Sequence, residues 1–132
     1  MKLKMVQVRS KVRPESRLYQ DLKKNTPDVL WHRIENMILP GTPDVLGYNM
    51  SQHYFTVETK VPKANAIRFE TFQVSYHITH PKNSFILIRR RNTETPKLFE
   101  GEKVELLNSV GHTKVKHIAN TWKKIRKVFD SV

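Results

Sequence analysis

The chain contains no cysteine among its 132 residues. It therefore has neither a disulfide framework nor a thiolate zinc site. No apolar run approaches the roughly 18 residues that a membrane-spanning helix requires. The first residues, Met1 to Lys4, lack the apolar stretch of a secretory signal. We therefore expect a cytoplasmic protein that does not cross a membrane.

Glycine is also scarce, with four residues, and none of them belongs to a glycine-rich phosphate-binding loop. The chain shows no Ser-His-Asp order typical of a hydrolase triad, no aromatic ribonucleoprotein motif and no low-complexity segment. Its length suits one compact domain and is too short for two. We expect a single domain over residues 1–132.

Acidic residues are few, with 12 Asp and Glu against 24 Lys and Arg. The resulting net charge of +12 and pI near 10.1 favour polyanionic partners. On charge alone, nucleic acid and an anionic membrane surface are both possible partners.

One stretch, from Gly41 to Lys60, carries the densest chemistry. The segment Tyr54 to Val61 is rich in aromatic and β-branched residues, which predicts a strand. Side chains alternate along a strand, so Glu58 and Lys60 share one face. Asp44 stands at the start of a short apolar stretch, Val45-Leu46, which we interpret as a neighbouring strand that pairs with this one.

Two carboxylates at one place repel each other unless a cation lies between them or one is protonated. Mg²⁺ takes oxygen ligands and uses one or two carboxylates together with phosphate oxygens and water. A lysine beside that ion orients or deprotonates an attacking water. The pattern of Asp44, Glu58 and Lys60 therefore indicates metal-assisted phosphodiester hydrolysis.

The same residues resemble the motif of the PD-(D/E)xK nuclease superfamily: Pro43-Asp44, thirteen intervening residues, then Glu58-Thr59-Lys60. Within that superfamily the order of segments is similar to virus-type replication-repair nucleases, archaeal-type Holliday junction resolvases and phage junction-resolving endonucleases. The resemblance covers about residues 13 to 101.

The resemblance implies an α/β, restriction-endonuclease-like core with a mixed sheet of about four or five strands flanked by helices. It implies Mg²⁺, replaceable by Mn²⁺, DNA as partner, a homodimer and no small-molecule cofactor. Asp44 and Glu58 would bind the ion with the carbonyl of Thr59. Lys60 would assist the nucleophile and Gln73 would orient it. Glu15 would bind a second ion or a bridging water, with Asp21 as the second choice for this position.

A repeated pentapeptide complicates the assignment of the aspartate. Thr-Pro-Asp-Val-Leu occurs at residues 26–30 and again at residues 42–46. We choose Asp44 over Asp28 because Gly41 frees the backbone before it for a tight turn, and because Asp44 leads directly into the Glu58 strand.

The other elements follow from periodicity and turn residues. Residues 2–11 are either a short edge strand or a frayed basic arm. The remaining expectations are a helix from Pro14, a strand within 29–34, a loop over 37–41, a hairpin turn at 48–53, a helix or a strand start over 66–80, a buried strand at 85–88, a hairpin over 97–107 and a basic amphipathic helix over 113–130.

Several basic residues are candidates for DNA backbone contacts. They are Arg33, Lys63, the cluster Arg89, Arg90 and Arg91, and Lys123, Lys124 and Lys127 of the last helix. Arg33 is equally well read as a solvated charge or as a partner of a site carboxylate. The basic side of the last helix suits DNA or a membrane surface, and the nuclease motif favours DNA. His77 and His80 have a spacing that can bind zinc, but a capping or surface role fits them better.

The resulting hypothesis is a metal-dependent DNA endonuclease, selective for branched DNA such as a Holliday junction and of phage type. Such an enzyme acts in recombination, replication or degradation of DNA. One alternative is a site-specific homing or restriction-type endonuclease, which shares the chemistry. The other is a basic nucleic-acid-binding module whose acidic residues are structural.

Overall fold

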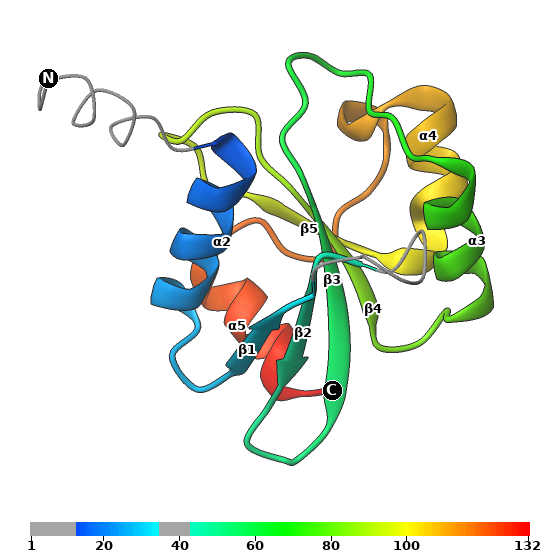
Figure 1. The fold of residues 1–132 in the computed structure, drawn as a ribbon. Coiled ribbons are helices and arrows are strands. Elements are labelled where there is room, and N and C mark those ends of the chain that lie inside the picture. Colours follow the sequence, from blue (N-terminus) through cyan, green and yellow to red (C-terminus); the bar gives the residue numbers. More distant parts are fainter. Residues whose placement is uncertain (1–12, 35–42) are drawn as a thin grey trace, which may run out of the picture.

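The computed structural model describes residues 13–34 and 43–132. The expectations for residues 2–11, for Glu35 and for the loop at 37–41 lie outside these ranges. The chain folds in the order α2 (Pro14–Asn25), β1 (Leu30–Arg33), β2 (Val45–Tyr48), β3 (Tyr54–Lys60), α3 (Thr71–Thr79), β4 (Ser84–Ile88), β5 (Lys97–Glu100), a 3-10 turn (Gly101–Lys103), α4 (Val104–Val110), a second 3-10 turn (His112–Lys114) and α5 (Trp122–Asp130) (Figure 1).

The five strands form one mixed sheet in the order β1-β2-β3-β4-β5. β1, β2 and β3 make an antiparallel meander, α3 crosses over from β3 to the parallel strand β4, and β5 returns antiparallel. The α/β class and the mixed sheet of five strands flanked by helices are thus confirmed. None of the helices in the described ranges is long and apolar enough to cross a membrane.

Alternation along the central strands divides the core into two layers. On one face, buried residues of α2 and α5 pack on Phe55, Phe85 and Leu87. On the other face, α4 and the segment before α3 pack on Ile86 and Ile88. Figure 1 shows α2 and α5 on one side of the sheet, and α3 and α4 on the other. β4 is buried along its whole length, as expected for a strand covered on both faces.

Aromatic rings fill the α2/α5 layer. Phe55 stacks on Phe129 with 4.7 Å between ring centroids, and Trp31 meets Phe55 edge-on at 5.4 Å. Gly47 lies under these rings, and a Cβ atom there would come within 2.6 Å of Phe55 and 2.9 Å of Trp31. The residue is glycine because the rings approach the backbone of β2 too closely for a side chain.

The hairpin expected over residues 97–107 is wrong in its second half. β5 occupies 97–100, but the chain then turns through Gly101–Lys103 into the helix α4. Val104 and Leu107 are fully buried three residues apart. That spacing places both side chains on one helical face, where a strand would separate them.

The last helix is shorter than the expected 113–130. α5 begins at Trp122, and the residues before it run extended along β5: Ile118 N–H donates to Leu98 O, and Leu98 N–H donates to Ala119 O, each at 2.8 Å. Thr121 then caps α5 by accepting from the Lys124 N–H. Apolar residues at helical spacing are buried here by an extended segment followed by a helix.

The helix expected over 66–80 also begins later, at Thr71. Ile67 and Phe69 are buried in a non-helical approach to it. Glu70 and Gln73 form a capping box that sets the start of α3. This cap positions Gln73 relative to the sheet.

Candidate active site

Asp44 and Glu58 come together across two neighbouring strands. The β2–β3 register pairs Val45 with Val57, and one residue further Asp44 lies opposite Glu58. Asp44 Oδ2 accepts hydrogen bonds from the Thr59 N–H at 2.9 Å and the Thr59 hydroxyl at 2.7 Å. The Asp44 carbonyl accepts from the Ile34 N–H, which ties this residue to the end of β1. Both the backbone and the carboxylate of Asp44 are therefore held in place.

Glu58 is the most buried acid of this cluster, with 2% of its surface exposed. Its Oε2 atom accepts a hydrogen bond from Gln73 Nε2 at 2.9 Å, and Oε1 has no partner among the described residues. Burial, followed by the negative charge of Asp44, raises the pKa of Glu58 to about 9, while Lys60 opposes the shift. In the protein alone, Glu58 therefore keeps its proton at neutral pH.

Lys60 and Gln73 complete the cluster from β3 and α3. Lys60 Nζ donates to Gln73 Oε1 at 3.1 Å, and the same oxygen accepts from the Glu70 N–H at 2.9 Å. The ammonium group also lies 5.0 Å from the centre of the Phe69 ring. Gln73 thus bridges Glu58 and Lys60, and its orientation is set by the cap of its own helix.

Glu15 reaches the same region from the first turn of α2. Partial burial and then the charge of Asp44 raise the pKa of Glu15, while Lys60 lowers it. Glu15 and Lys60 line one open pocket of about 300 Å³ together with Lys63 and Arg68. Asp21, the second choice from the sequence, lies elsewhere and pairs with Arg89 at 2.8 Å.

The donor set fits a hard divalent cation through two carboxylates only. Within residues 13–34 and 43–132, no three acidic or histidine side chains gather closely enough to hold an ion together. Asp44 and Glu58 nevertheless present facing carboxyl oxygens, one of them without a hydrogen-bond partner in the described chain. Mg²⁺ is suited to such a pair because it retains several waters and takes phosphate oxygens. Roles for Glu15 and for the Thr59 carbonyl as ligands stay predictions.

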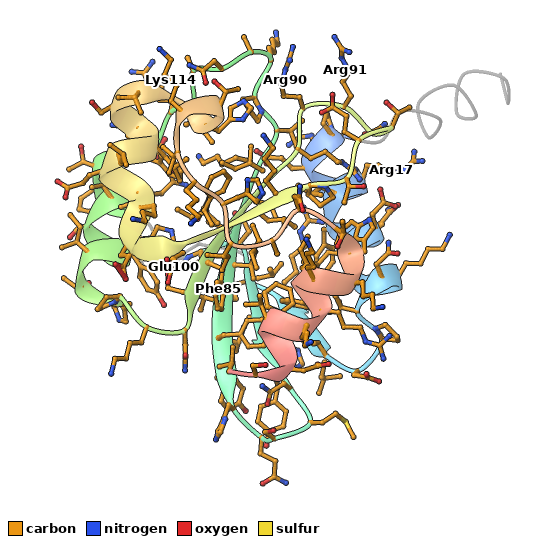
Figure 2. The ribbon with its side chains drawn as sticks, turned by 180° about the vertical axis from the view of Figure 1, so that it is seen from behind. Arg17, Phe85, Arg90, Arg91, Glu100 and Lys114 are labelled. Carbon is orange, nitrogen blue, oxygen red and sulfur yellow. The ribbon has the colours of Figure 1, made fainter. Side chains whose placement is uncertain are left out.

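The three consecutive arginines do not act as one cluster. Arg89 is 4% exposed, and its guanidinium group donates a hydrogen bond to Asp21 on α2. The side chain of Arg89 is therefore buried and does not face solvent. Arg90 is partly buried and donates to the Lys63 carbonyl at 3.0 Å, whereas Arg91 is exposed. Figure 2 shows Arg90 and Arg91 along the same edge of the molecule. Only these two of the three arginines present charge for a DNA backbone contact.

The other basic candidates contact or extend from α2 and α5, the two helices that cover the face of the sheet opposite to Glu58 and Lys60. Arg33 is exposed, donates to Ser16 Oγ at 3.2 Å and lies 5.2 Å from the Tyr19 ring centre. Lys123, Lys124 and Lys127 extend from α5, whose buried residues pack on the face opposite to Glu58 and Lys60. The structure does not bring these three lysines to the carboxylates.

Asp28, the aspartate of the other pentapeptide, pairs with a residue of α5 and not with the carboxyl cluster. Its side chain is exposed and pairs with Arg126 of α5.

His77 is fully buried, and its Nδ1 atom lies 2.5 Å from Ser84 Oγ. The expectation of a capping or surface role is therefore wrong for this residue. Burial lowers the pKa of His77 to about 4.

Arg68 is the residue of this pocket that sequence reasoning missed. It is exposed between the buried residues Ile67 and Phe69 and lines the pocket with Lys60. The alternation of Ile67, Arg68 and Phe69 carried the signal, since it directs the arginine away from a buried pair. The expectation of a helix from residue 66 hid it.

The described residues thus bring two facing carboxyl groups, a lysine and a glutamine together beside the central strands of a mixed sheet. No protein-family model and no curated protein matches the chain. Among solved structures, the chain is similar to Hjc from Archaeoglobus fulgidus, a Holliday junction resolvase from an archaeal hyperthermophile, with 16% sequence identity and a TM-score of 0.49. The likeness covers 64% of this chain and 72% of that chain.

Proposed function

We propose that the protein is a metal-dependent DNA endonuclease that hydrolyses phosphodiester bonds at the cluster of Asp44, Glu58, Lys60 and Gln73. The observation that carries this proposal is the pairing of Glu58 with Asp44. Two facing carboxyl groups, one deeply buried, gain stability when a divalent cation replaces the proton that burial otherwise keeps on Glu58. A purely structural pair would have no need of a lysine and a glutamine aimed at the same place.

Asp44 and Glu58 would hold the cation. When bound, Mg²⁺ polarises a phosphoryl oxygen and lowers the pKa of a bound water, and Mn²⁺ can replace it. The Thr59 N–H and hydroxyl keep Asp44 oriented toward that position. Gln73 holds both Glu58 and Lys60, so it positions the carboxylate and the ammonium group together.

Lys60 supplies the charge nearest to the substrate phosphate. Its ammonium group reaches the open pocket through which Glu15, Lys63 and Arg68 are also accessible. A phosphodiester in this pocket meets three cationic side chains, and Lys60 contributes a hydrogen-bond donor that holds the scissile phosphate or the attacking water. Lys63 and Arg68 contact the flanking backbone.

The finer parts of the proposal are selectivity for branched DNA, a homodimer, and an origin of phage type. A net charge of +12 on a short chain favours contacts to the DNA backbone. A homodimer would place two such sites on opposing strands of a junction.

The test is cleavage of linear duplex, single strand, flap and four-way junction with Mg²⁺, beside Lys60→Ala and Asp44→Asn. We expect cutting that requires the cation and falls at least about a hundredfold in both variants. Asp28→Asn is the matched control, because Asp28 has the same sequence neighbours and an exposed ion pair instead of the site.

Symmetric cutting of the junction would support a resolvase, and cutting of only the duplex or single strand would keep the nuclease and remove the junction preference. Salt-sensitive binding of every substrate without cutting, with Mg²⁺ or with Mn²⁺, would overturn the proposal in favour of a binding module.

A further inference from the structure

An exposed row of apolar and aromatic side chains crosses the open half of the sheet. The strand register aligns Leu30 with Tyr48, and Tyr48 with Tyr54. Cross-strand partners of this kind lie on the same face. Leu30 is 59% exposed and Tyr54 is 57% exposed, while the rings of Tyr48 and Tyr54 contact each other with 4.5 Å between centroids and a tilt of 40°.

A second row lies beside the first and leads toward the candidate active site. It consists of His32, Leu46 and Thr56, again in register. Every second side chain of β3 points to this face, and these side chains are Tyr54, Thr56, Glu58 and Lys60.

The two rows belong to the half of the sheet that the helices leave open. On this face, the buried cluster contains residues of β4, β5 and the segments around α3 and α4, and it contains none from β1 or β2. Figure 1 shows α3 and α4 over the β4 side, with β1 and β2 away from them. In the described part of the chain, this face is therefore a surface.

The face and the site are close enough to touch one DNA strand. Tyr54 precedes Glu58 by four residues, which is about 13 Å along a strand. Stacked nucleotides rise 3.4 Å each, so this distance corresponds to about four base steps. Neither row contains an acidic side chain. The two rows therefore do not repel a phosphate backbone that leads toward Glu58.

We propose that the open face of β1, β2 and β3 is a stacking platform for unpaired DNA bases, leading into the nuclease site. The inference rests on the proposed function and specifies its substrate: DNA with unpaired bases within about four nucleotides of the cleaved bond. Exposed aromatic faces bind successive bases of any sequence, and Tyr48 and Tyr54 offer two of them side by side.

A second copy of the chain is the less favoured occupant. The two rows comprise six residues, whereas a stable protein interface uses about 20–30 residues on each side. The net charge of +12 attracts nucleic acid to an uncharged face more strongly than it attracts a second copy of the same charge. Charge and area both favour the nucleic acid.

The experiment measures binding without cleavage. Lys60→Ala protein in EDTA is titrated with fluorescent oligothymidylate and with an abasic oligonucleotide of the same length. We expect oligothymidylate to bind about tenfold more weakly when Tyr54→Ala or Tyr54→Leu is added. Tyr54→Phe should bind as before, because the ring supplies the stacking surface. Phe72→Ala is the matched control, since Phe72 is 60% exposed on α3.

The abasic oligonucleotide separates stacking from charge. On the platform hypothesis it binds weakly to every variant, and Tyr54→Ala does not weaken it further. Equal binding of the two oligonucleotides, or an equal loss in Tyr54→Ala and Phe72→Ala, would overturn the platform. So would a dimer, detected by sedimentation, that Tyr54→Ala dissociates while oligothymidylate binding is unchanged. Melting temperatures verify that each variant is folded, and the cleavage assay above tests the nuclease independently.

Discussion

Glu58 lies beneath Gln73 and opposite Asp44, with its pKa raised to about 9 by burial and by the neighbouring charge. In the unfolded chain its pKa is the ordinary 4.5. A raised pKa in the folded state means that the stability it contributes is fully present below pH 4.5 and is lost as the pH rises toward 9. The protein without a cation therefore loses stability across the neutral range.

Glu58→Gln removes this titration. We expect the wild type to lose up to about 4 kcal/mol relative to Glu58→Gln between about pH 5 and about pH 8 in EDTA. Both proteins contain His77, whose lowered pKa changes stability with pH in the opposite direction, so the comparison removes its contribution. Thermal unfolding over pH measures the difference, and Mg²⁺ should raise the melting temperature of the wild type and leave that of the variant nearly unchanged. Parallel pH profiles would show that Glu58 is ionised in the folded protein.

Arg89 tests whether a basic residue beside the site supports the fold or binds the substrate. Its side chain is 3% exposed and is bonded to Asp21, so Arg89→Ala leaves a buried cavity and leaves Asp21 with only the longer contact to Arg17 at 3.8 Å. We expect a loss of about 3 kcal/mol in the free energy of unfolding. Arg91→Ala, at an exposed neighbour, should change it by less than about 0.5 kcal/mol. Urea denaturation of both proteins decides, and equal stabilities would refute the structural role.

Local patterns predicted which candidate side chains lie together better than they predicted the bounds of the elements around them. Alternation along β3 placed Glu58 and Lys60 on one face, and the glycine before Asp44 distinguished it from Asp28. Arg89 could not be assigned in this way, because its partner is 68 positions away in the sequence. A pairing at that distance leaves no trace in local periodicity.

The last helix was predicted too long for a physical reason. Between residues 113 and 130 the apolar positions repeat at helical spacing, yet the first half hydrogen-bonds to Leu98 instead of forming a helix. Burial alone sets the apolar pattern, and an extended segment lying on the edge of a sheet satisfies the same burial. The backbone N–H and C=O groups of Leu98 at the edge of β5 decide the outcome, and they are distant in sequence.

The start of α5 at Trp122 can be tested through its cap. The Thr121 hydroxyl accepts a hydrogen bond from the Lys124 N–H, and the next turn buries Ile125. Thr121→Ala should lower the free energy of unfolding by about 1 kcal/mol, and Thr121→Ser should restore it. A helix that continued upstream to residue 113 would give no cap at Thr121, and Thr121→Ala would then be neutral or stabilising in urea denaturation.

At the scale of the whole molecule, exposed basic residues of the described chain lie both beside the candidate site and on the opposite face of the sheet. Lys63 and Arg68 line the pocket that contains Lys60. Lys123 and Lys127 extend from α5, which packs on the opposite face of the sheet. Both pairs are exposed, and replacing either pair by glutamine lowers the formal charge equally, from +12 to +10. The two double variants therefore differ in where the charge is removed and not in how much.

Binding to DNA centred on the site predicts different results for the two variants. Each backbone contact contributes about 0.9 to the slope of log affinity against log salt concentration. Lys63→Gln with Arg68→Gln should reduce the slope by about 2 and slow cleavage, whereas Lys123→Gln with Lys127→Gln should leave both nearly unchanged. Titrations of duplex DNA into inactive Lys60→Ala protein at several salt concentrations measure the slopes. Equal losses would mean that the DNA also contacts α5, and that the bound strand passes from one face of the sheet to the other.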